Sequence, residues 1–568
     1  MSLSGGRLIA EMLKLQNTQV MFGMGGFQLL PLYEGVRQLG VRHILINDER
    51  TGAFAADAYA RITGQPGVCD ATLGPGATNL TTALAESFNA GVPLIAITGD
   101  AHRDFAGRNM TQETTQTQIL RSVAKDVVRI ENAKRIPELM RYAFSLACTG
   151  RPGPVVVDVP EDVSHAELTE EEAALTGNPA PFKTPAFRCR PAAADIERAA
   201  ELLASAKRPV ILAGGGIHIS QACDALQSLA ESHDIPVAHT LSGKGAIACT
   251  HPLSLGLFGR YDRIANDFIA KSDGVLVVGC KLGEIATKRY SLPGPGIPMI
   301  HLDIEPVEIG RWRPADVALF GDARCGLEDI YDALDKKSIR KEYLAEVVAE
   351  HKKWRTDAQD RYQSSERPIN VGRIMGELNA HWPEDGILVA DGGFASHWTG
   401  LLYDTKRNGR GFVAGRGMAS IGYGLPGSLG CKLAAPDRPV IGLTGDGGFN
   451  MAVGDLETAR RASAGFALIV INNAASGYVK ALQHAVYGEG NYQSSDLSEL
   501  DYADVAKAYG CDGIRVEDPS ELAAAIKLAA KPRDIPLVID VVVTRDPGKM
   551  LPAADSRTLT VEKGDRPV

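Results

Sequence analysis

The sequence predicts an α/β protein built from three doubly wound parallel-sheet domains. Short apolar strand patterns alternate with helical patterns along the chain, which is typical of parallel sheets covered by helices. Glycines follow several of these strands directly, in LAGGG, VADGG and TGDGG, and tight turns at strand ends are where such sheets bind ligands. The 568 residues are also too many for one hydrophobic core.

The strand patterns divide the chain into three domains. Residues 1–166 carry VMFGM, ILIND, VCDATLG, LIAITGD and PVVVDVP. After a polar, proline-bearing linker, residues 190–335 carry RPVILAGGG, IPVAHTLSG, GVLVVGC and PMIHLDI. A charged helical segment leads to residues 366–545, with GILVADGG, RPVIGLTGDGG, FALIVINN and PLVIDVVV. The tail, residues 546–568, has little periodicity, and we expect it to be mobile or to form a lid.

Composition excludes several classes of partner. The net charge of −9 and the pI of about 5.8 give no electrostatic reason to expect nucleic acid or an acidic membrane surface. No apolar run is long enough to cross a bilayer, and MSLSGGRLIAEML lacks the basic start of a signal peptide. The nine scattered cysteines contain no C-x-x-C pair, which favours a reducing compartment. We therefore expect a cytoplasmic protein.

Two strand ends in the third domain carry the most specific motif. VIGL ends in Gly445-Asp446-Gly447, and after a helix ALIVI ends in Asn472-Asn473. Parallel strands end at the same edge of a sheet, so Asp446 and Asn473 should converge there. A carboxylate and an amide oxygen suit Mg²⁺ or Ca²⁺, and the glycines admit a phosphate to backbone N–H groups. The full pattern predicts a divalent ion that bridges the protein to a diphosphate.

Glu49 lies where a strand of the first domain turns into an alanine-rich helix, in HILINDERTGAFAADAYAR. Locally this is a helix start, with Asp48 or Asn47 as the N-cap and Glu49 at the positive end of the helix dipole. A carboxylate at the ligand edge of a parallel sheet is also a candidate for chemistry. The local pattern leaves both interpretations open.

The segment from Asp446 to Asn473 matches the thiamine diphosphate motif, and the chain resembles the acetolactate synthase-like family of thiamine diphosphate enzymes. The resemblance covers most of residues 1–545, through VMFGMGGFQLLPLYEGV, DERTGAFAADAYARITGQPGVCDATLGPGATNLTTALAESFNAGVPLIAITGD and GMASIGYGLPGSLGCKLAAPDRPVIGLTGDGGF. It implies a pyrimidine-binding, a central and a diphosphate-binding domain, in that order. It also implies a small-molecule substrate and an active site shared between subunits. We therefore expect a homodimer as the minimal active unit and a homotetramer as the assembly.

The resemblance implies roles for single residues. Glu49 matches the carboxyl group that hydrogen-bonds the cofactor's aminopyrimidine, so that this ring can remove the proton from the thiazolium C2. Asp446 and Asn473 match the side-chain ligands of Mg²⁺, with the backbone carbonyl of Ala475 as a third ligand. Gln112 matches a glutamine near the substrate. Further contacts to the cofactor are implied for Pro75, Asn79, Gly393, Phe394, Ala395, Ala419, Ile421, Gly447, Gly448, Ser476 and Gly477.

Two of these positions have a distinct implied task. The backbone of Ala419 would meet the pyrimidine amino group. Ile421, in MASIGYG, would hold the cofactor in its bent shape. Lys125 matches a basic position near the cleft, although a solvated surface lysine explains it equally well.

Departures from the typical biosynthetic enzyme gather around the substrate. Asp48 replaces a histidine, Thr111 a phenylalanine, and Leu482 a channel tryptophan. Phe394 and Ala395 replace a glutamine and a histidine of the diphosphate loop. The residues that match cofactor and metal contacts are kept. The resemblance therefore implies that activation of the cofactor is retained, and it does not determine the substrate.

Three further departures mark candidate substrate residues. Phe27 replaces the second glycine of a tight G-G pair and would add a ring to the pocket. Lys281 stands where an arginine handles the carboxylate of the second keto acid, and Arg260 stands where the enzyme has methionine. Both cations suit an anionic acceptor or a nucleotide-like group, and both are explained equally well as surface charges.

The resemblance is compatible with three classes of enzyme. The first is a Mg²⁺-dependent lyase or carboligase that acts on a 2-keto acid. The second is a 2-hydroxyacyl-CoA lyase or oxalyl-CoA decarboxylase, whose relatives close a C-terminal segment over the site. The third is a flavin-dependent pyruvate oxidase. Acetolactate synthases often hold FAD in the central domain, where LAGGGIHIS is a weak nucleotide signal. Retention of Glu49, Asp446 and Asn473 argues against a non-catalytic regulatory protein.

Overall fold

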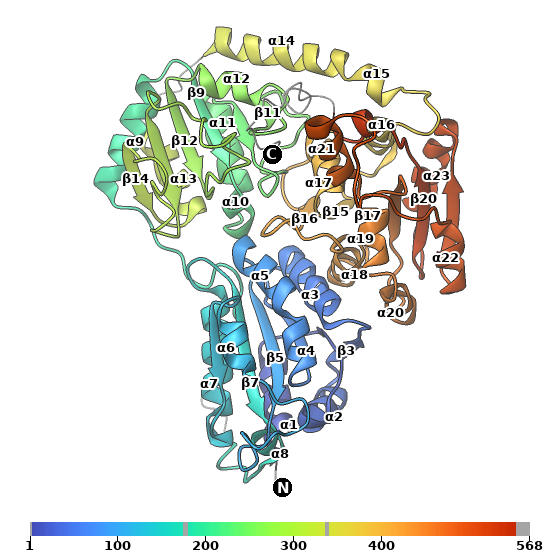
Figure 1. The fold of residues 1–568 in the computed structure, drawn as a ribbon. Helices are drawn as coiled ribbons and strands as arrows, with labels where there is room; N and C mark the ends of the chain where they lie inside the picture. Colours follow the sequence, from blue (N-terminus) through green and yellow to red (C-terminus); the bar gives the residue numbers. More distant parts are fainter. Residues whose placement is uncertain (1–2, 174–179, 335–339, 553–568) are drawn as a thin grey trace.

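The computed structural model describes residues 3–173, 180–334 and 340–552, which we call the N-terminal, central and C-terminal units. Within these ranges each unit contains one sheet of six parallel strands, covered by helices. Figure 1 shows the three units as separate lobes, with α14 (Lys341–Asp357) passing from the central to the C-terminal unit. The predicted fold class, three doubly wound parallel-sheet domains, is confirmed.

The N-terminal unit orders its sheet β3-β2-β4-β5-β7-β6. Its strands are β2 (Val20–Gly23), β3 (Arg42–Leu45), β4 (Gly67–Ala71), β5 (Leu94–Asp100), β6 (Asp126–Arg129) and β7 (Pro154–Pro160), besides a small antiparallel pair of β1 (Leu3–Ser4) and β8 (Glu167–Leu168). Its helices are α1 (Gly5–Leu15), α2 (Leu30–Leu39), α3 (Glu49–Thr63), α4 (Pro75–Asn79), α5 (Thr81–Ala90), α6 (Gln116–Arg121), α7 (Ile136–Cys148) and α8 (Glu161–His165).

The C-terminal unit repeats this arrangement, with the order β16-β15-β17-β18-β20-β19. Its strands are β15 (Ile387–Ala390), β16 (Phe412–Ala414), β17 (Val440–Gly445), β18 (Ala467–Asn472), β19 (Asp512–Val516) and β20 (Leu537–Val542). Its helices are α15 (Gln359–Tyr362), α16 (Val371–His381), α17 (Phe394–Leu402), α18 (Gly424–Ala434), α19 (Asp446–Asn450), α20 (Asp455–Arg461), α21 (Gly477–Tyr487), α22 (Tyr502–Ala508) and α23 (Leu522–Ala529). The two units therefore share one topology, which their sequences do not show.

The central unit has a different order, β11-β10-β9-β12-β13-β14, which is the order of dinucleotide-binding sheets. Its strands are β9 (Pro209–Ala213), β10 (Val237–His239), β11 (Ser254–Leu257), β12 (Gly274–Val278), β13 (Met299–Asp303) and β14 (Val317–Phe320). Its helices are α9 (Ala193–Ser205), α10 (Gly216–Ile219), α11 (Cys223–His233), α12 (Ala265–Ala270) and α13 (Ala323–Ala333). The strand order reverses between β9 and β12, and ligands bind such sheets at this point.

The middle strands explain why the apolar runs form parallel sheets. Every residue of β4, β5, β7, β9 and β12 is buried, as expected for strands covered by helices on both faces.

None of the described helices is long and apolar enough to span a bilayer. The first part of the predicted tail is ordered, since Met550 and Leu551 are buried beside Ala475; residues 553–568 lie outside the described part of the chain.

The N-terminal and C-terminal units dock through α3 and α18. A Cβ atom added to Gly430 of α18 would lie 2.0 Å from the carbonyl oxygen of Ala55 in α3, so the two helix backbones are in close contact. Across this joint the Tyr423 hydroxyl donates to Asp57, 2.7 Å away. The central and C-terminal units are joined by Arg263, which donates to Asp404 (2.6 Å) and lies over the ring of Trp354.

This close contact predicts a specific stability defect. Gly430→Ala should lower the free energy of unfolding by about 1–3 kcal/mol, the usual cost of forcing a methyl group into a packed interior, despite the better helix propensity of alanine. Gly296→Ala is the matched control, because a Cβ there meets no atom within 4 Å. Chemical denaturation of both variants measures the difference, and equal stabilities would show that α3 and α18 are not in tight contact.

Candidate active site

Glu49 is the first residue of α3, but it does not cap the helix. Asp48 is the N-cap, and its side chain accepts a hydrogen bond from the Arg50 N–H at 2.9 Å. Glu49 is instead 5% exposed, and its Oε2 accepts from the Asn79 amide at 2.9 Å. A Cβ on Gly76 would lie 3.0 Å from its Oε1. The structure thus brings Glu49 and the predicted loop around Pro75 and Asn79 together.

The same loop is held against the segment that carries Gln112. A Cβ on Gly74 would lie 2.1 Å from the backbone oxygen of Gln112, and the Gly74 N–H donates to the Gln116 side chain at 3.0 Å. Gly74 and Gln112 both have positive φ, +63° and +66°. The exposed Gln112 side chain therefore starts from a backbone that contacts the Glu49 loop.

Asp446 and Asn473 meet at the carboxyl ends of β17 and β18. The Oδ2 atom of Asp446 accepts from the backbone N–H groups of Asn473 (3.2 Å) and Ala475 (3.3 Å). Its Oδ1 accepts from the Gly447 N–H at 2.8 Å, and the Ala475 N–H also donates to Asn473 Oδ1 at 3.2 Å. The convergence expected from the motif is present in the structure.

This donor set fits a hard cation. Burial raises the pKa of Asp446 to about 6, although the backbone N–H groups around it act in the opposite direction. A bound cation would compensate for that burial. In the part of the chain that the structure describes, no three His, Cys, Asp or Glu side chains group as a metal site. An ion here would need the mixed set of a carboxylate, an amide and a backbone carbonyl, which suits Mg²⁺.

The loop before α17 adjoins the Asp446 site. Gly393 has φ +58°, and a Cβ on it would lie 3.7 Å from Ile421, which is 50% exposed. A Cβ on Gly477 would lie 2.5 Å from the Asn473 amide and 3.4 Å from the Phe394 ring. The predicted residues Gly393, Phe394, Ile421, Asn473 and Gly477 are thus neighbours.

Asp391 organises this loop from inside the C-terminal unit. It is 1% exposed and accepts hydrogen bonds from the backbone N–H groups of Gly392 (2.7 Å), Tyr423 (3.0 Å) and Gly422 (3.2 Å), and from the Thr444 hydroxyl. A Cβ on Gly448 would lie 2.4 Å from its Oδ2. One buried carboxylate therefore joins the loop around Ile421 to the end of β17.

The Glu49 site and the Asp446 site lie on different units. Among the described residues no hydrogen bond links Glu49 to Asp446, Asn473 or Ala475. The residues beside Glu49 instead contact the C-terminal unit at the segment after α19 and at the start of α20, where Asp455 accepts from the Asn47 N–H at 3.0 Å. The Asn47 amide donates to the Gly454 carbonyl (3.0 Å) and Arg50 donates to the Met451 carbonyl (2.9 Å).

The candidate substrate residues are scattered. Phe27 is 60% exposed and stacks on His165, with ring centroids 5.6 Å apart. Arg260 is buried and donates to the Tyr478 hydroxyl of α21 at 2.8 Å. Lys281 donates to the Asn89 carbonyl at 2.5 Å. No hydrogen bond or ring contact joins these three side chains within the described ranges.

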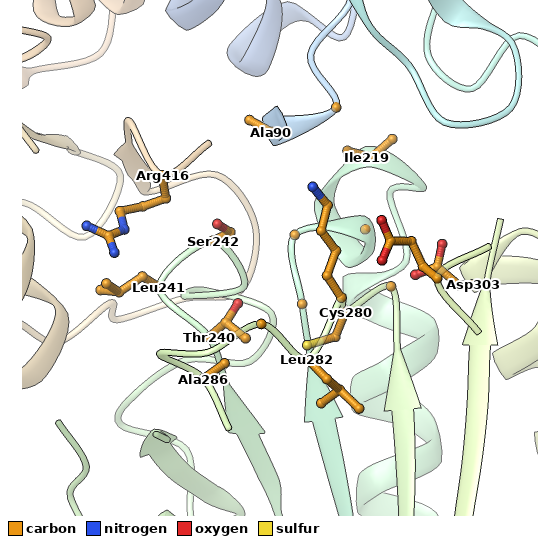
Figure 2. Close-up of a pocket in the computed structure, with 18 of the residues that line it drawn as sticks. Ala90, Ile219, Thr240, Leu241, Ser242, Cys280, Leu282, Ala286, Asp303 and Arg416 are labelled. Atoms are coloured by element: carbon orange, nitrogen blue, oxygen red, sulfur yellow. The ribbon is translucent and has the colours of Figure 1, made fainter. Parts of the chain in front are cut away.

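A cavity of about 450 Å³ lies at the carboxyl end of the central sheet, where its strand order reverses. Residues that follow all six strands of this sheet line it, including Gly214–Gly216 after β9 and Gly279–Ala286 after β12. A Cβ on Gly216 would lie 2.6 Å from the Gly279 Cα, so these glycines allow a close approach of two loops. Figure 2 shows Asp303 and Arg416 on opposite sides of the cavity.

The cavity has both a basic and an acidic wall. Partial burial, with Arg151 nearby, lowers the pKa of Lys281 to about 8. Burial raises the pKa of Asp303 to about 6, and the neighbouring Glu308 acts in the same direction. Sequence reasoning identified Lys281 but missed Arg151, Asp303 and Arg416. Of these three residues only Asp303 had a signal in the sequence, because it is a carboxylate near the end of the predicted strand PMIHLDI.

Family comparisons identify the chain. Residues 3–119 match the model of the thiamine pyrophosphate enzyme N-terminal TPP binding domain, residues 196–330 the central domain, and residues 391–541 the C-terminal TPP binding domain. The chain belongs to the thiamine pyrophosphate enzyme family. Thiamine pyrophosphate is the thiamine diphosphate of the motif above, so the three matched regions agree with the three sheets of the structure.

Named relatives narrow the kind of thiamine pyrophosphate enzyme. The chain is 34% identical to a probable acetolactate synthase large subunit of Methanocaldococcus jannaschii, over 97% of this chain and 93% of the relative. It is 32% identical to the acetolactate synthase large subunit of Corynebacterium glutamicum (96% and 87%) and 30% identical to that of isozyme 2 of Escherichia coli K12 (92% and 93%). The chain is thus an acetolactate synthase-like, thiamine pyrophosphate-dependent carboligase.

One basic residue of this thiamine pyrophosphate enzyme has a structural role that the sequence did not indicate. The Lys125 ammonium group donates to the carbonyls of Leu146 (2.8 Å), Thr149 (2.6 Å) and Arg151 (2.9 Å). It therefore caps the C-terminal end of α7, and it is not a solvated surface lysine.

The Asp391 contacts predict a measurable contribution of Thr444 to stability. Thr444→Val keeps the side-chain shape but removes a hydrogen bond to a buried carboxylate, so unfolding should become easier by about 1.5–3 kcal/mol. Thr399→Val is the control, because its buried hydroxyl donates to the neutral Ala395 carbonyl of its own helix and should cost about 1 kcal/mol or less. Equal losses in denaturant titrations would contradict the assignment.

Proposed function

We propose that this chain is a thiamine diphosphate- and Mg²⁺-dependent C–C bond lyase or carboligase that acts on a 2-keto acid. The reaction would be that of acetolactate synthase, in which a two-carbon unit from one 2-keto acid joins a second one with loss of CO₂. The observation that carries the proposal is the meeting of Asp446 and Asn473 at one sheet edge, together with a buried Glu49 whose carboxyl group is held by Asn79.

Mg²⁺ would be held by Asp446, Asn473 and the backbone carbonyl of Ala475, and it would neutralise the cofactor's diphosphate. Further cofactor contacts would come from the Pro75–Asn79 loop and from the loops that carry the remaining predicted residues: Gly393, Phe394, Ala395, Ala419, Ile421, Gly447, Gly448, Ser476 and Gly477. When bound, thiamine diphosphate supplies the electron sink for breaking and making a bond next to a carbonyl carbon.

Glu49 would hold and share a proton at the N1′ atom of the aminopyrimidine ring. Asn79 occupies its Oε2, which fixes the plane of the carboxyl group and leaves Oε1 as the free oxygen for that proton. Burial between α3 and the Gly74–Asn79 loop keeps water away from this proton. Gln112 would orient the substrate, because its backbone contacts the same loop.

The separation of the two half-sites supports a proposal for the assembly. Since Glu49 and Asp446 share no contact within the described chain, we propose that a homodimer completes each site with Glu49 from one subunit and Asp446 from the other, and that dimers pair into a tetramer. We further propose that the enzyme is cytoplasmic and that its domains are residues 1–166, 190–335 and 366–545, followed by the tail 546–568.

The central cavity would bind an adenine nucleotide, with FAD as the first candidate. Three observations support this: the dinucleotide-type strand order, the glycine-lined loops at its reversal point, and a cavity with both cationic and acidic walls. Basic side chains suit a diphosphate, and Asp303 suits ribose hydroxyls. Coenzyme A shares the adenosine diphosphate group, and this keeps the 2-hydroxyacyl-CoA lyase or oxalyl-CoA decarboxylase type as the second candidate.

A substrate panel with thiamine diphosphate and Mg²⁺ tests the proposal. We expect pyruvate to be consumed with formation of acetolactate and without oxygen uptake. Oxygen uptake would instead identify a flavin-dependent pyruvate oxidase. Cleavage of an acyl-CoA, with stabilisation by coenzyme A but not by FAD, would identify the second candidate. No turnover of any keto acid or acyl-CoA would overturn the proposed function.

Glu49→Gln should abolish exchange of the cofactor's C2 proton with solvent while leaving Mg²⁺-dependent cofactor binding largely intact. The amide keeps the shape of the side chain but cannot share a proton with the pyrimidine ring. Asp446→Ala should do the opposite and weaken cofactor binding first. Exchange measured by NMR in D₂O and binding measured by calorimetry separate the two, and unchanged exchange in Glu49→Gln would remove Glu49 from its role.

The cavity should bind adenosine diphosphate less tightly as the pH rises through about 8. Below that pH the Lys281 side chain is protonated and attracts the diphosphate, and above it the charge is lost. We expect a decrease of about tenfold, the loss of one charge-assisted contact. Lys281→Met should flatten the pH profile, whereas Lys352→Met on the exposed face of α14 should leave it unchanged. A wild-type profile that is flat between pH 7 and 9 would contradict the assignment.

A further inference from the structure

An irregular loop from Gly417 to Tyr423 carries both Ala419, whose backbone is predicted to meet the pyrimidine amino group, and Ile421, which is predicted to hold the cofactor in its bent shape. Ala419 has φ +58°, a left-handed conformation that is costly for a residue with a Cβ and persists only where neighbouring contacts impose it. Met418 and Ile421 are about half exposed. The loop therefore does not keep its shape through its own packing.

Two buried carboxylates hold this loop, one at each end. Asp391 of the C-terminal unit accepts the N–H groups of Gly422 and Tyr423. The other is Glu86, in the middle of α5 of the N-terminal unit, and it is 0% exposed. Its Oε1 accepts from the Gly417 N–H and its Oε2 from the Met418 N–H at 2.7 Å.

Ser420 adds weaker contacts to the same oxygen of Glu86, through its N–H at 3.5 Å and its hydroxyl at 3.4 Å. The loop also packs directly on α5, since a Cβ on Gly417 would lie 2.0 Å from the Glu86 carbonyl oxygen. A buried carboxylate is costly unless hydrogen-bonded, and here the donors are the backbone N–H groups on both sides of Ala419. Among the described residues the nearest cation to this carboxylate is Arg61, 4.0 Å away.

We propose that Glu86 is a positioning residue for cofactor activation: it imposes the left-handed turn at Ala419 and so sets the backbone that meets the aminopyrimidine. This inference rests on the proposed function. The diphosphate end of the site, at Asp446 and Asn473, has its own hydrogen bonds. Loss of the Glu86 contacts should therefore slow activation of the cofactor more than it weakens cofactor binding.

Glutamine cannot replace Glu86 in this role. Both carboxylate oxygens are acceptors, one for Gly417 and one for Met418 and Ser420. A glutamine side chain has one acceptor oxygen and one NH₂ group, so it must point a donor at one of these N–H groups. Its size is nevertheless the same, so the packing of α5 is retained.

The test compares C2-proton exchange of bound thiamine diphosphate with its dissociation constant, using the full-length protein with thiamine diphosphate and Mg²⁺. In Glu86→Gln we expect exchange to slow by about tenfold or more, the equivalent of one charge-assisted hydrogen bond, while the dissociation constant changes much less. Glu377→Gln is the matched control, because Glu377 pairs with Arg373 on α16 away from the loop, and it should leave both values unchanged.

Gly417→Ala tests the same contact from the loop side, because its Cβ must push the loop away from α5 while Glu86 stays intact. It should show the same selective loss of exchange. A C2-proton exchange rate equal to that of the wild-type protein, in either variant, would overturn the proposal. A slower exchange accompanied by equal losses of cofactor affinity and folding stability would overturn it too. Absence of exchange in the wild-type protein would overturn the proposed function itself, so the two failures are distinguishable.

Discussion

The buried carboxylate of Asp57 is the interaction on which the arrangement of the site depends. It lies in the middle of α3 and accepts hydrogen bonds from Arg61 (2.6 Å), from Ser87 of α5 (2.8 Å) and from Tyr423 of the C-terminal unit (2.7 Å). A buried charge of this kind is stable only when its partners are all in place. It therefore fixes α3, α5 and the segment before α18 relative to one another.

The chemistry is distributed along these three elements. Helix α3 begins with Glu49, α5 carries Glu86, and Tyr423 ends the loop that holds Ala419 and Ile421. One docking contact inside the chain thus fixes the Glu49 half-site relative to the loops of the C-terminal unit, and in the proposed homodimer these two half-sites belong to two different active sites. The shared topology of the N-terminal and C-terminal units makes this possible, because both sheets present their carboxyl ends to ligands.

Much of the fold was predictable from the sequence, because central parallel strands are continuous apolar runs. The strands that were missed from the three sheets all lie at sheet edges, where a strand pairs on one side only and is short or partly exposed: β6, β11, β14, β16 and β19. Asp446 and Asn473 were predictable because each ends a strong strand pattern. The role of Glu86 was not predictable, because a glutamate within an alanine-rich helix is expected to face solvent, and its hydrogen-bond partners lie in another unit.

The central cavity shares walls with the cofactor loop. Asn89 and Ala90 follow Glu86 on the last turn of α5, Gly417 accompanies Arg416, and all four residues line the cavity. A molecule bound in the cavity thus contacts both sides of the hydrogen-bonded junction between Glu86 and the loop. This junction is therefore a route by which a ligand of the cavity would be thermodynamically linked to thiamine diphosphate. If one ligand changes the affinity of the protein for the other by some factor, the second ligand must change the affinity for the first by the same factor.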